Sequence, residues 1–464
     1  MTAVYYLLGV LFVALGVAVS IGLHEVGHLV PAKRFGVKVT QYMVGFGPTL
    51  WSRQRGETEY GIKAIPLGGY IRMIGMFPPK AGEDPRFVRA SSTGRVGLIV
   101  DQAVKARADR RPGIADQARD ASLQEIEPGD EDRVFYRLTV PRKVVIMLGG
   151  PFMNLVIATV LLTVIVTGFG TAQTTTRLSS VSQCVLPADA AVDRTCAPAD
   201  PAAPAAAAGL RPGDVITSYA GRAVSSWDEV RVAIRAGGTS AVELGVRSAD
   251  GTTRTVRVTP IVTDRPRVDE TTGELLTGAD GAVLTDRVGF LGVSPSTELV
   301  PQSVTAVPGV LWTGLTRTAG VVLQIPQKMV GVAQAAFGSG ERDPNGPVSV
   351  VGVGRFAGEV ASIESTEAYG GRERTADLLS LIASLNLALF VFNLIPLLPL
   401  DGGHVAGALW EGLRRTVARL RHRADPGPVD VARLLPVAYA VSGVLLVMSV
   451  LLIYADIVKP IRLG

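Results

Sequence analysis

Long apolar runs alternate with charged stretches along this chain. Three runs contain few charged residues and exceed the roughly 20 residues that a helix needs to cross a bilayer. They cover about 4–30, 144–168 and 434–457. A fourth run, at about 378–400, is also apolar but is interrupted by Asn393, Pro396 and Pro399. The pattern predicts four membrane-spanning helices, of which the third in chain order is broken near its C-terminal end.

The charges between these runs predict how the helices cross the membrane. Lysine and arginine are concentrated in 31–143 and in 412–425, whereas 170–377 carries few of them close to the helices. The positive-inside rule therefore places 31–143 and 412–433 in the cytoplasm. We expect 170–377 and both ends of the chain outside. The first run has no basic start and no small-residue cleavage site, so it should stay as an anchor rather than leave as a signal peptide.

The fold class that follows is a polytopic α-helical membrane protein with four transmembrane helices. Of the 464 residues, 47% are hydrophobic and 19% are charged, below the usual share of about a quarter. The net charge of +5 is small for this length and gives no reason to expect a nucleic-acid partner.

The expected segments are helix 1 at 1–32, a cytoplasmic region at 33–142, helix 2 at 143–169, an extracytoplasmic domain at 170–296, an amphipathic helix and linker at 297–377, broken helix 3 at 378–411, a cytoplasmic loop at 412–433 and helix 4 at 434–458.

The cytoplasmic region combines two patterns. Residues 56–76 alternate polar and apolar side chains around Gly68 and Gly69, which predicts a membrane-associated β-hairpin or β-loop on this side. Residues 78–137 are charged and show little apolar periodicity. We expect surface helix and mobile loop there, without chemistry of its own.

The external domain has the element order of a PDZ domain. After a Pro/Ala-rich stretch at 197–208, the pattern predicts short helix, tight turn, strand, turn and helix, then a hairpin with Asp250 and Gly251 at its tip. With Ala-Gly-Leu-x-Pro-Gly-Asp-Val-Ile at 208–216, this α+β domain resembles the bacterial PDZ domains, which add a peptide end as a strand. The resemblance implies a carboxylate-binding loop comprising Gly289, Phe290, Leu291 and Gly292. A domain that serves only as a spacer or steric cap is the alternative.

Both cysteines of the chain, Cys184 and Cys196, fall in the external part. An even pair in an oxidising compartment favours a disulfide. Closing so short a loop would contribute about 3 kcal/mol at most. Two unpaired thiols are the alternative.

Residues 304–336 form a further, moderately apolar stretch with Pro308 and Pro326 in it. Threonine, arginine, glutamine and lysine are scattered along it, so we interpret it as an external amphipathic helix that lies along the membrane. A further span is the alternative, and it would invert the topology of everything that follows.

Candidate chemistry appears inside the first apolar run. The sequence IGLHEVGHLV at 21–30 places His24 and His28 four residues apart, on one face of a helix, with Glu25 beside them. This H-E-x-x-H pattern suits a zinc ion held by two imidazoles, with the glutamate as general base for an attacking water. The chain has four histidines, and ionisable groups within a span are costly, so a chance pattern is the weaker interpretation.

A catalytic zinc site needs a third protein ligand. Asp401 follows the broken apolar run, after Pro396 and Pro399, at the depth predicted for His24. Irregular backbone at membrane depth is tolerated only against protein or water, and a carboxylate there favours a cation. We therefore expect Asp401 as the third ligand and one zinc ion per chain. A carboxylate at the water boundary, or an N-cap for the helix after it, is the alternative.

Several features follow one another along the chain in an order typical of one family. They are HEVGH at 24–28, PLGGY at 66–70, GGPFMN at 149–154, the PDZ pattern, GPVSV at 346–350 and S-x-N-x6-N-x2-P-x2-P-L-D-G-G at 384–403. This combination resembles the site-2 proteases, which are intramembrane zinc metalloproteases, and among them the bacterial RseP type. The family pattern often has two PDZ modules in tandem, and this chain has room for one.

The resemblance implies further roles. Asn393 would contact the substrate backbone or the transition state, and Asn154 would be a structural polar contact between helices. His404 and His422 are not expected to be essential. An edge strand that holds an unwound substrate would comprise Gly68, Gly69 and Tyr70.

The implied function is hydrolysis of peptide bonds in single-span membrane proteins, such as anti-sigma factors and remnant signal peptides, in regulated intramembrane proteolysis. The expected setting is a bacterial cytoplasmic membrane, with the lipid bilayer and an upstream protease of the site-1 type as partners. A catalytically inactive PDZ scaffold or chaperone and a zinc transporter are the alternatives. The intact Glu25 argues against the first, and the presence of one ion site argues against the second.

Overall fold

The computed structural model of the protein describes residues 2–79, 114–187, 194–267, 276–278, 283–338, 340, 342–344, 346–365 and 369–461. It divides into two compact units, one formed by Met1–Gly168 with Ser303–Gly464 and the other by Phe169–Gln302. The first unit holds the predicted spans and the second holds the predicted PDZ domain. Of the charged segment predicted at 78–137, residues 80–113 lie outside the described residues.

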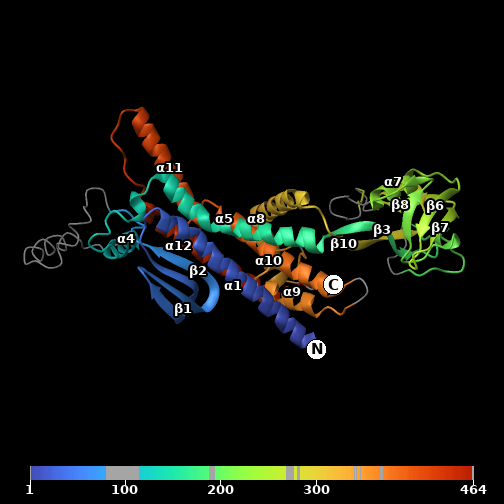
Figure 1. Ribbon diagram of the computed structural model, residues 1–464, viewed down its shortest axis with the longest axis horizontal. Coiled ribbons are helices and arrows are strands. Elements are labelled where there is room, and N and C mark those ends of the chain that lie inside the picture. The colour runs from blue at the N-terminus through green and yellow to red at the C-terminus, as the bar shows by residue number, and fades with distance from the viewer. Residues whose placement is uncertain are drawn as a thin grey trace, which may run out of the picture. The chain divides into compact units, whose positions relative to one another are not determined.

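Among the described residues, four helical segments are long and apolar enough to cross a membrane (Figure 1). They are α1 (Thr2–Arg34), α5 (Val140–Val164) with the π-helical turn Ile165–Phe169, α10 (Gly371–Asn393), and α12 (Leu435–Val458) with the 3-10 turn Val431–Leu434. Many of their large apolar side chains are exposed, as expected of residues that face lipid. These helices and the inserted β-sheet unit confirm the predicted polytopic fold class.

Small residues and buried amides bring the spanning helices together. Gly16 of α1 lies directly against Ile382 of α10, where a Cβ would come within 2.5 Å of the isoleucine side chain. Four residues further along α1, Ser20 accepts a hydrogen bond of 2.9 Å from the buried Asn386 of α10. Helices in lipid commonly associate through such close approaches and interhelical hydrogen bonds.

The third span ends where the sequence predicts a break. After α10 stops at Asn393, an irregular connection leads to α11 (Asp401–Leu420). Glycine lets this connection lie against the first turn of α11, because a Cβ on Gly402 would be 2.3 Å from the Ile395 oxygen. The segment predicted as one broken helix at 378–411 is therefore two helices, and the second extends beyond that boundary.

A curved β-sheet follows α1 in the chain and packs beside it (Figure 1). It is built from β1 (Val39–Arg55) and β2 (Thr58–Met73). Both strands bend, so that 41–44 pair with 69–72 on one side and with 59–62 on the other. Within the part of the chain that is described, 69–72 pair with no strand on their outer side, so this segment is a free edge.

The predicted β-loop at 56–76 covers β2 but leaves out the first strand of the sheet. The chain reverses at Gly56, and the first strand begins as early as Val39. Gly68 and Gly69 lie inside β2, where Gly68 bends the strand with a φ of 96° that glycine adopts at little cost. The alternation of polar and apolar residues did not predict β1, because buried and exposed side chains do not alternate along most of this bent strand.

Residues 114–137 pack against the base of the sheet. Leu123 of α4 (Ile114–Gln124) joins a small apolar core with Ile74. Asp130 and Glu127 both hydrogen bond to Lys38 at 2.7 Å and raise the pKa of its ammonium group. The described part of the predicted surface segment is thus attached to the sheet by apolar and charged contacts.

Helix α8 (Val307–Phe337) is continuous through both prolines. Pro308 lies in its first turn, where a missing N–H costs nothing. At its C-terminal end, Val332 and Ala336 pack against Ala455 of α12. Among the described helices α8 does not qualify as a candidate span, which agrees with the amphipathic interpretation. That it lies along the membrane stays a prediction.

A buried ion pair ties the start of α9 (Val350–Ser362) to α12. Asp456 of α12 pairs with Arg342, and the side chains are 1% and 4% exposed. The same carboxylate accepts the backbone N–H of Ser349 at 2.6 Å, and Ser349 caps α9 with its hydroxyl. The GPVSV sequence at 346–350 therefore has a structural explanation, since it passes through this buried contact.

The second unit is a PDZ-like α+β domain. Its main sheet has the order β10-β3-β4-β6-β7, and the expected hairpin with Asp250 and Gly251 at its tip joins β6 and β7. Side chains from the sheet and from α7 form one apolar core. The elements are β3 (Thr171–Val181), α6 (Pro204–Ala207), β4 (Val215–Tyr219), β5 (Arg222–Ala223), α7 (Trp227–Ala236), β6 (Val242–Arg247), β7 (Thr253–Val258), β8 (Ile261–Pro266), β9 (Thr285–Phe290) and β10 (Val293–Val300).

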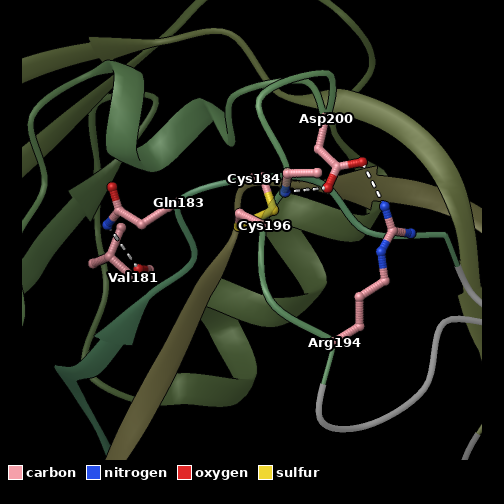
Figure 2. Close-up of a disulfide and its surroundings, with 7 residues drawn as sticks. Val181, Gln183, Cys184, Arg194, Cys196 and Asp200 are labelled. Carbon is pink, nitrogen blue, oxygen red and sulfur yellow. Dashed lines mark hydrogen bonds and ion pairs between the residues drawn. A yellow bond between two sulfur atoms is a disulfide. The ribbon is translucent and has the colours of Figure 1, made fainter.

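Cys184 and Cys196 are joined by a disulfide in this unit (Figure 2). Beside it, Asp200 accepts the backbone N–H of Ala197 at 2.8 Å and pairs with Arg194 at 2.7 Å. The loop that the disulfide closes is therefore also held by a carboxylate with two partners.

Candidate metal centre

Both histidines of HEVGH lie on the same face of α1. One helical turn separates them, and their Nε2 atoms are 3.3 Å apart. His28 is buried and His24 is largely shielded, with side chains 7% and 13% exposed. Two imidazoles that point one nitrogen each at the same place can share one cation.

Asp401 completes a three-atom group with the two histidines. Its Oδ2 atom lies 3.4 Å from Nε2 of His24 and 3.4 Å from Nε2 of His28. A tetrahedral zinc ion with bonds of about 2.0–2.1 Å separates two of its ligand atoms by about 3.3 Å. The three sides of this triangle agree with that spacing, so the residues fit a zinc ion with a fourth position left open. Among the described residues, this is the one histidine and carboxylate group close enough to hold a metal.

The backbone of α5 orients the His28 ring. The Nδ1 atom of His28 lies 2.7 Å from the carbonyl oxygen of Ile146, and a carbonyl oxygen can only accept a hydrogen bond. Nδ1 therefore donates, and in the neutral ring this leaves Nε2 free to face the group of donor atoms. Metal-binding histidines commonly use their second nitrogen in this way.

Asn154 of α5 does the same for His24. The amide nitrogen is placed 3.1 Å from Nδ1 of His24, and the amide oxygen has no partner although it is buried. Rotating the amide by half a turn brings this oxygen to Nδ1–H, which satisfies the buried oxygen and frees Nε2 for a metal. The sequence predicted only a structural contact for Asn154. The signal that could have found its role was a lone amide within an apolar span.

Glycines allow α1 and α5 to meet at the histidines. A Cβ on Gly27 would lie 2.2 Å from the oxygen of Gly149, and one on Gly149 would lie 2.0 Å from the oxygen of Gly27. A Cβ on Gly150 would lie 2.2 Å from Nε2 of His28. Side chains here would separate the helices or fill the space in front of the donor atoms. The GGPFMN sequence therefore leaves room for the metal centre.

Glu25, next to His24 in α1, lies against β2 of the β-sheet. Its side chain is buried, and its Cγ would be 2.9 Å from a Cβ on Gly69. Of the predicted substrate-binding strand, Gly69 is thus brought to the centre, and Gly68 lies next to it in β2. The ring of Tyr70 stacks on Phe46, with centroids 6.3 Å apart. A free strand edge and a carboxylate therefore meet beside the three donor atoms.

Other predicted residues are not part of the group of donors. Asn393 is half-buried at the last position of α10. His404 follows Asp401 on α11 and lines a small cavity with Lys143 and Glu411, and it is not one of the three residues whose ligand atoms come together. His422 is exposed beyond the end of α11. The expectation that both histidines are not essential stays a prediction.

The predicted carboxylate-binding loop belongs to the PDZ-like unit. Gly289 lies under the end of α7, where a Cβ would be 2.0 Å from the oxygen of Ile234. The carbonyls of Leu291 and Gly292 accept backbone N–H groups at 2.9 and 2.8 Å, and Phe290 is paired within the β8–β9 ladder. These contacts hold the loop in the domain, and its role in peptide binding stays a prediction.

Comparison with known proteins gives a consistent result. A family model described as peptidase family M50 matches residues 12–424, which include Glu25 and the three donor residues. The zinc metalloproteases Rip1 of Mycobacterium tuberculosis and of Mycolicibacterium smegmatis are each 33% identical to this chain, and the alignments cover 99% and 98% of both proteins. The metalloprotease MmpA of Caulobacter vibrioides is 27% identical over 90% of this chain and 89% of its own.

Proposed function

Because the chain belongs to peptidase family M50 and is an intramembrane zinc metalloprotease of regulated intramembrane proteolysis, we propose that His24, His28 and Asp401 hold its zinc ion. The observation that carries this assignment is the triangle of donor atoms with sides of 3.3–3.4 Å. One ion per chain follows from one such group among the described residues. The scaffold and transporter alternatives do not account for the family membership.

Glu25 is the catalytic base in this proposal. A bound zinc ion supplies Lewis acidity, which activates water and polarises the substrate carbonyl. Glu25 accepts the proton of the attacking water and returns it to the leaving amide nitrogen. The α5 contacts of His24 and His28 keep each ring in the tautomer that leaves Nε2 unprotonated.

The substrate binds as an added strand at 69–72. A helical substrate hides its peptide bonds in hydrogen bonds, so it must unwind before cleavage. The free edge of β2 offers backbone partners to an unwound segment, and Gly69 brings that edge next to Glu25. Asn393, at the end of α10, is the proposed further contact to the substrate backbone.

The membrane setting completes the proposal. The charge distribution favours an orientation with 31–143 and 412–433 inside and the single PDZ-like domain outside, and the bacterial relatives support a bacterial cytoplasmic membrane. Substrates are single-span proteins, such as anti-sigma factors and remnant signal peptides, already shortened outside by a protease of the site-1 type. The PDZ-like domain takes part in selecting the shortened ends.

The decisive experiment compares wild-type protein with Glu25→Gln in detergent, using a single-span model substrate. We expect a decrease in kcat of at least about 100-fold, since general base catalysis contributes that much or more. Glu298→Gln is the matched control, because this glutamate is exposed in the PDZ-like unit and should leave kcat unchanged. Glu25→Gln protein that retains zinc but cleaves at the wild-type rate would refute the assignment of the base.

A further inference from the structure

The chain reverses direction at the end of α11. The N–H of Arg423 donates to the oxygen of Ala418 at 2.8 Å, and the N–H of His422 donates to the oxygen of Arg419 at 3.1 Å. This pair of bonds defines a Schellman turn, and His422 occupies its left-handed position with a φ of 48°. The turn directs the following residues back along the helix.

The returning chain is held close to α11. Arg414 donates to the oxygen of Pro426 at 3.1 Å, and Arg415 pairs with Asp425 at 3.4 Å. A groove of about 370 Å³ lies between the helix and the returning chain. In Figure 1 the end of α11 extends away from the other helices of its unit, and the following chain runs back beside it.

The groove has walls of two different chemistries. The apolar wall is formed by one face of α11, where Trp410 and Leu413 are 56% and 54% exposed. The face continues along the groove with Val417. Three arginines, Arg414 and Arg421 of the helix and its C-cap and Arg423 of the returning chain, make the rest of the lining a cationic rim.

The orientation of α11 about its own axis directs this apolar face away from the helical unit. On the other side of the helix, Glu411 pairs with Lys143 of α5 at 2.8 Å, and both side chains are almost fully buried. Glu411 also accepts the N–H of Val429 at 3.2 Å from the returning chain. The buried pair therefore fixes which face of α11 packs and which one lines the groove.

The cationic rim has free charges. Within the described part of the chain, neither Arg421 nor Arg423 pairs with a carboxylate, and both are exposed. The acidic groups nearest to them in sequence are engaged elsewhere, since Asp425 pairs with Arg415 and Glu411 with Lys143. An anion that enters the groove would find guanidinium groups available.

We propose that this groove binds an anionic phospholipid. Its phosphate lies against Arg421 and Arg423, because guanidinium groups match phosphate oxygens in pairs. Its acyl chain covers the apolar wall, and the Trp410 indole takes the interfacial position that tryptophan favours in membranes. A free phosphate ion would use the rim and leave the apolar wall exposed to water, so the observations favour a lipid.

The groove also lies close to the bilayer along the chain. Its last residue, Pro426, is followed shortly by the candidate span that begins at Val431. Basic segments next to a span contribute about fivefold in affinity for anionic lipid per charge. The proposal does not depend on catalysis, since none of the groove residues contributes a donor atom to the metal centre.

The test uses the full chain in phosphatidylcholine nanodiscs that contain brominated phosphatidylglycerol. Quenching of Trp410 is isolated by subtracting the signal of a Trp410→Phe variant. We expect stronger quenching by the brominated anionic lipid than by the same fraction of brominated phosphatidylcholine. Arg421→Gln and Arg423→Gln should each weaken this preference about fivefold. Arg419→Gln is the matched control, because Arg419 is exposed on the same helix but does not line the groove.

Three outcomes would overturn the proposal. Equal quenching by both brominated lipids in the wild type, or an equal loss in Arg419→Gln, would mean that the groove selects no anionic lipid. Competition by inorganic phosphate or glycerol phosphate at equal concentration would identify a site for soluble phosphate instead. Unchanged zinc content in all variants checks that they are folded.

Discussion

Two groups of side chains in the helical unit each bring an aspartate next to basic residues, but they differ in geometry. At the end of α12, Asp456 pairs with Arg342 and accepts the N–H of Ser349 at 2.6 Å. At the metal centre, Asp401 lies 3.4 Å from two imidazole nitrogens, longer than a good hydrogen bond of about 3.0 Å. The first carboxylate is satisfied by protein groups. The second faces donors that are spaced for an ion between them.

The difference separates structural from functional buried charge. A closed pair such as Arg342 and Asp456 offsets the cost of burial with its own hydrogen bonds and leaves no room for a ligand. The open triangle of His24, His28 and Asp401 gives up direct contacts, and under the proposed assignment a bound cation offsets that cost. Burial and charge alone therefore do not identify a site, whereas the spacing of the atoms does.

The largest expected effects come from exchanging the two aspartates for asparagine. Asp456→Asn leaves Arg342 buried without a counter-charge and should lower the free energy of unfolding by about 3–5 kcal/mol, with zinc per folded chain unchanged. Asp401→Asn should lose zinc but leave the stability of the metal-free protein within about 1 kcal/mol. Unfolding in detergent with a chelator and zinc analysis measure both. Loss of zinc in Asp456→Asn together with unchanged stability would contradict the structural role assigned to Asp456.

A smaller effect is expected from the asparagine that orients His24. Asn154→Ala should weaken zinc binding about 10- to 100-fold, because partners of metal-bound histidines contribute that much. Chelator competition measures this affinity. Asn386→Ala is the matched control, since this buried asparagine bonds to Ser20 and should change stability but not zinc affinity. Equal zinc affinity in Asn154→Ala and the wild type would exclude the proposed role.

The smallest effect is expected from the double variant in which both members of the buried Lys143–Glu411 pair are replaced. Glu411→Met alone should lower the free energy of unfolding by about 3–5 kcal/mol, because it leaves Lys143 buried without a counter-charge. Lys143→Met alone should lower it less, because Glu411 keeps its pair with Arg415 at 3.1 Å. The double variant should return to within about 1 kcal/mol of the wild type, since apolar side chains often replace a buried pair without loss. A double variant as unstable as the sum of the single ones would contradict the closed-pair interpretation.

Much of the fold follows from local patterns. The four spans follow from apolar length, and the break before Asp401 follows from Pro396 and Pro399, because proline cannot continue a helix. The β-sheet was located only in part. The β-loop at 56–76 was predicted, but β1 was not, because the pairing of a bent strand depends on partners that lie far away in sequence.

The sequence alone predicted which residues are the candidates to bind zinc. The spacing of His24 and His28 needs nothing beyond one helical turn, so HEVGH carries half of the site by itself. Only the tertiary structure decided what those residues face. The carbonyl of Ile146, the amide of Asn154 and the carboxylate of Asp401 come from positions more than 100 residues away, and packing of α5 and α11 brings them in. Helix geometry is local, whereas the triangle of donor atoms exists only after burial has fixed how three helices meet.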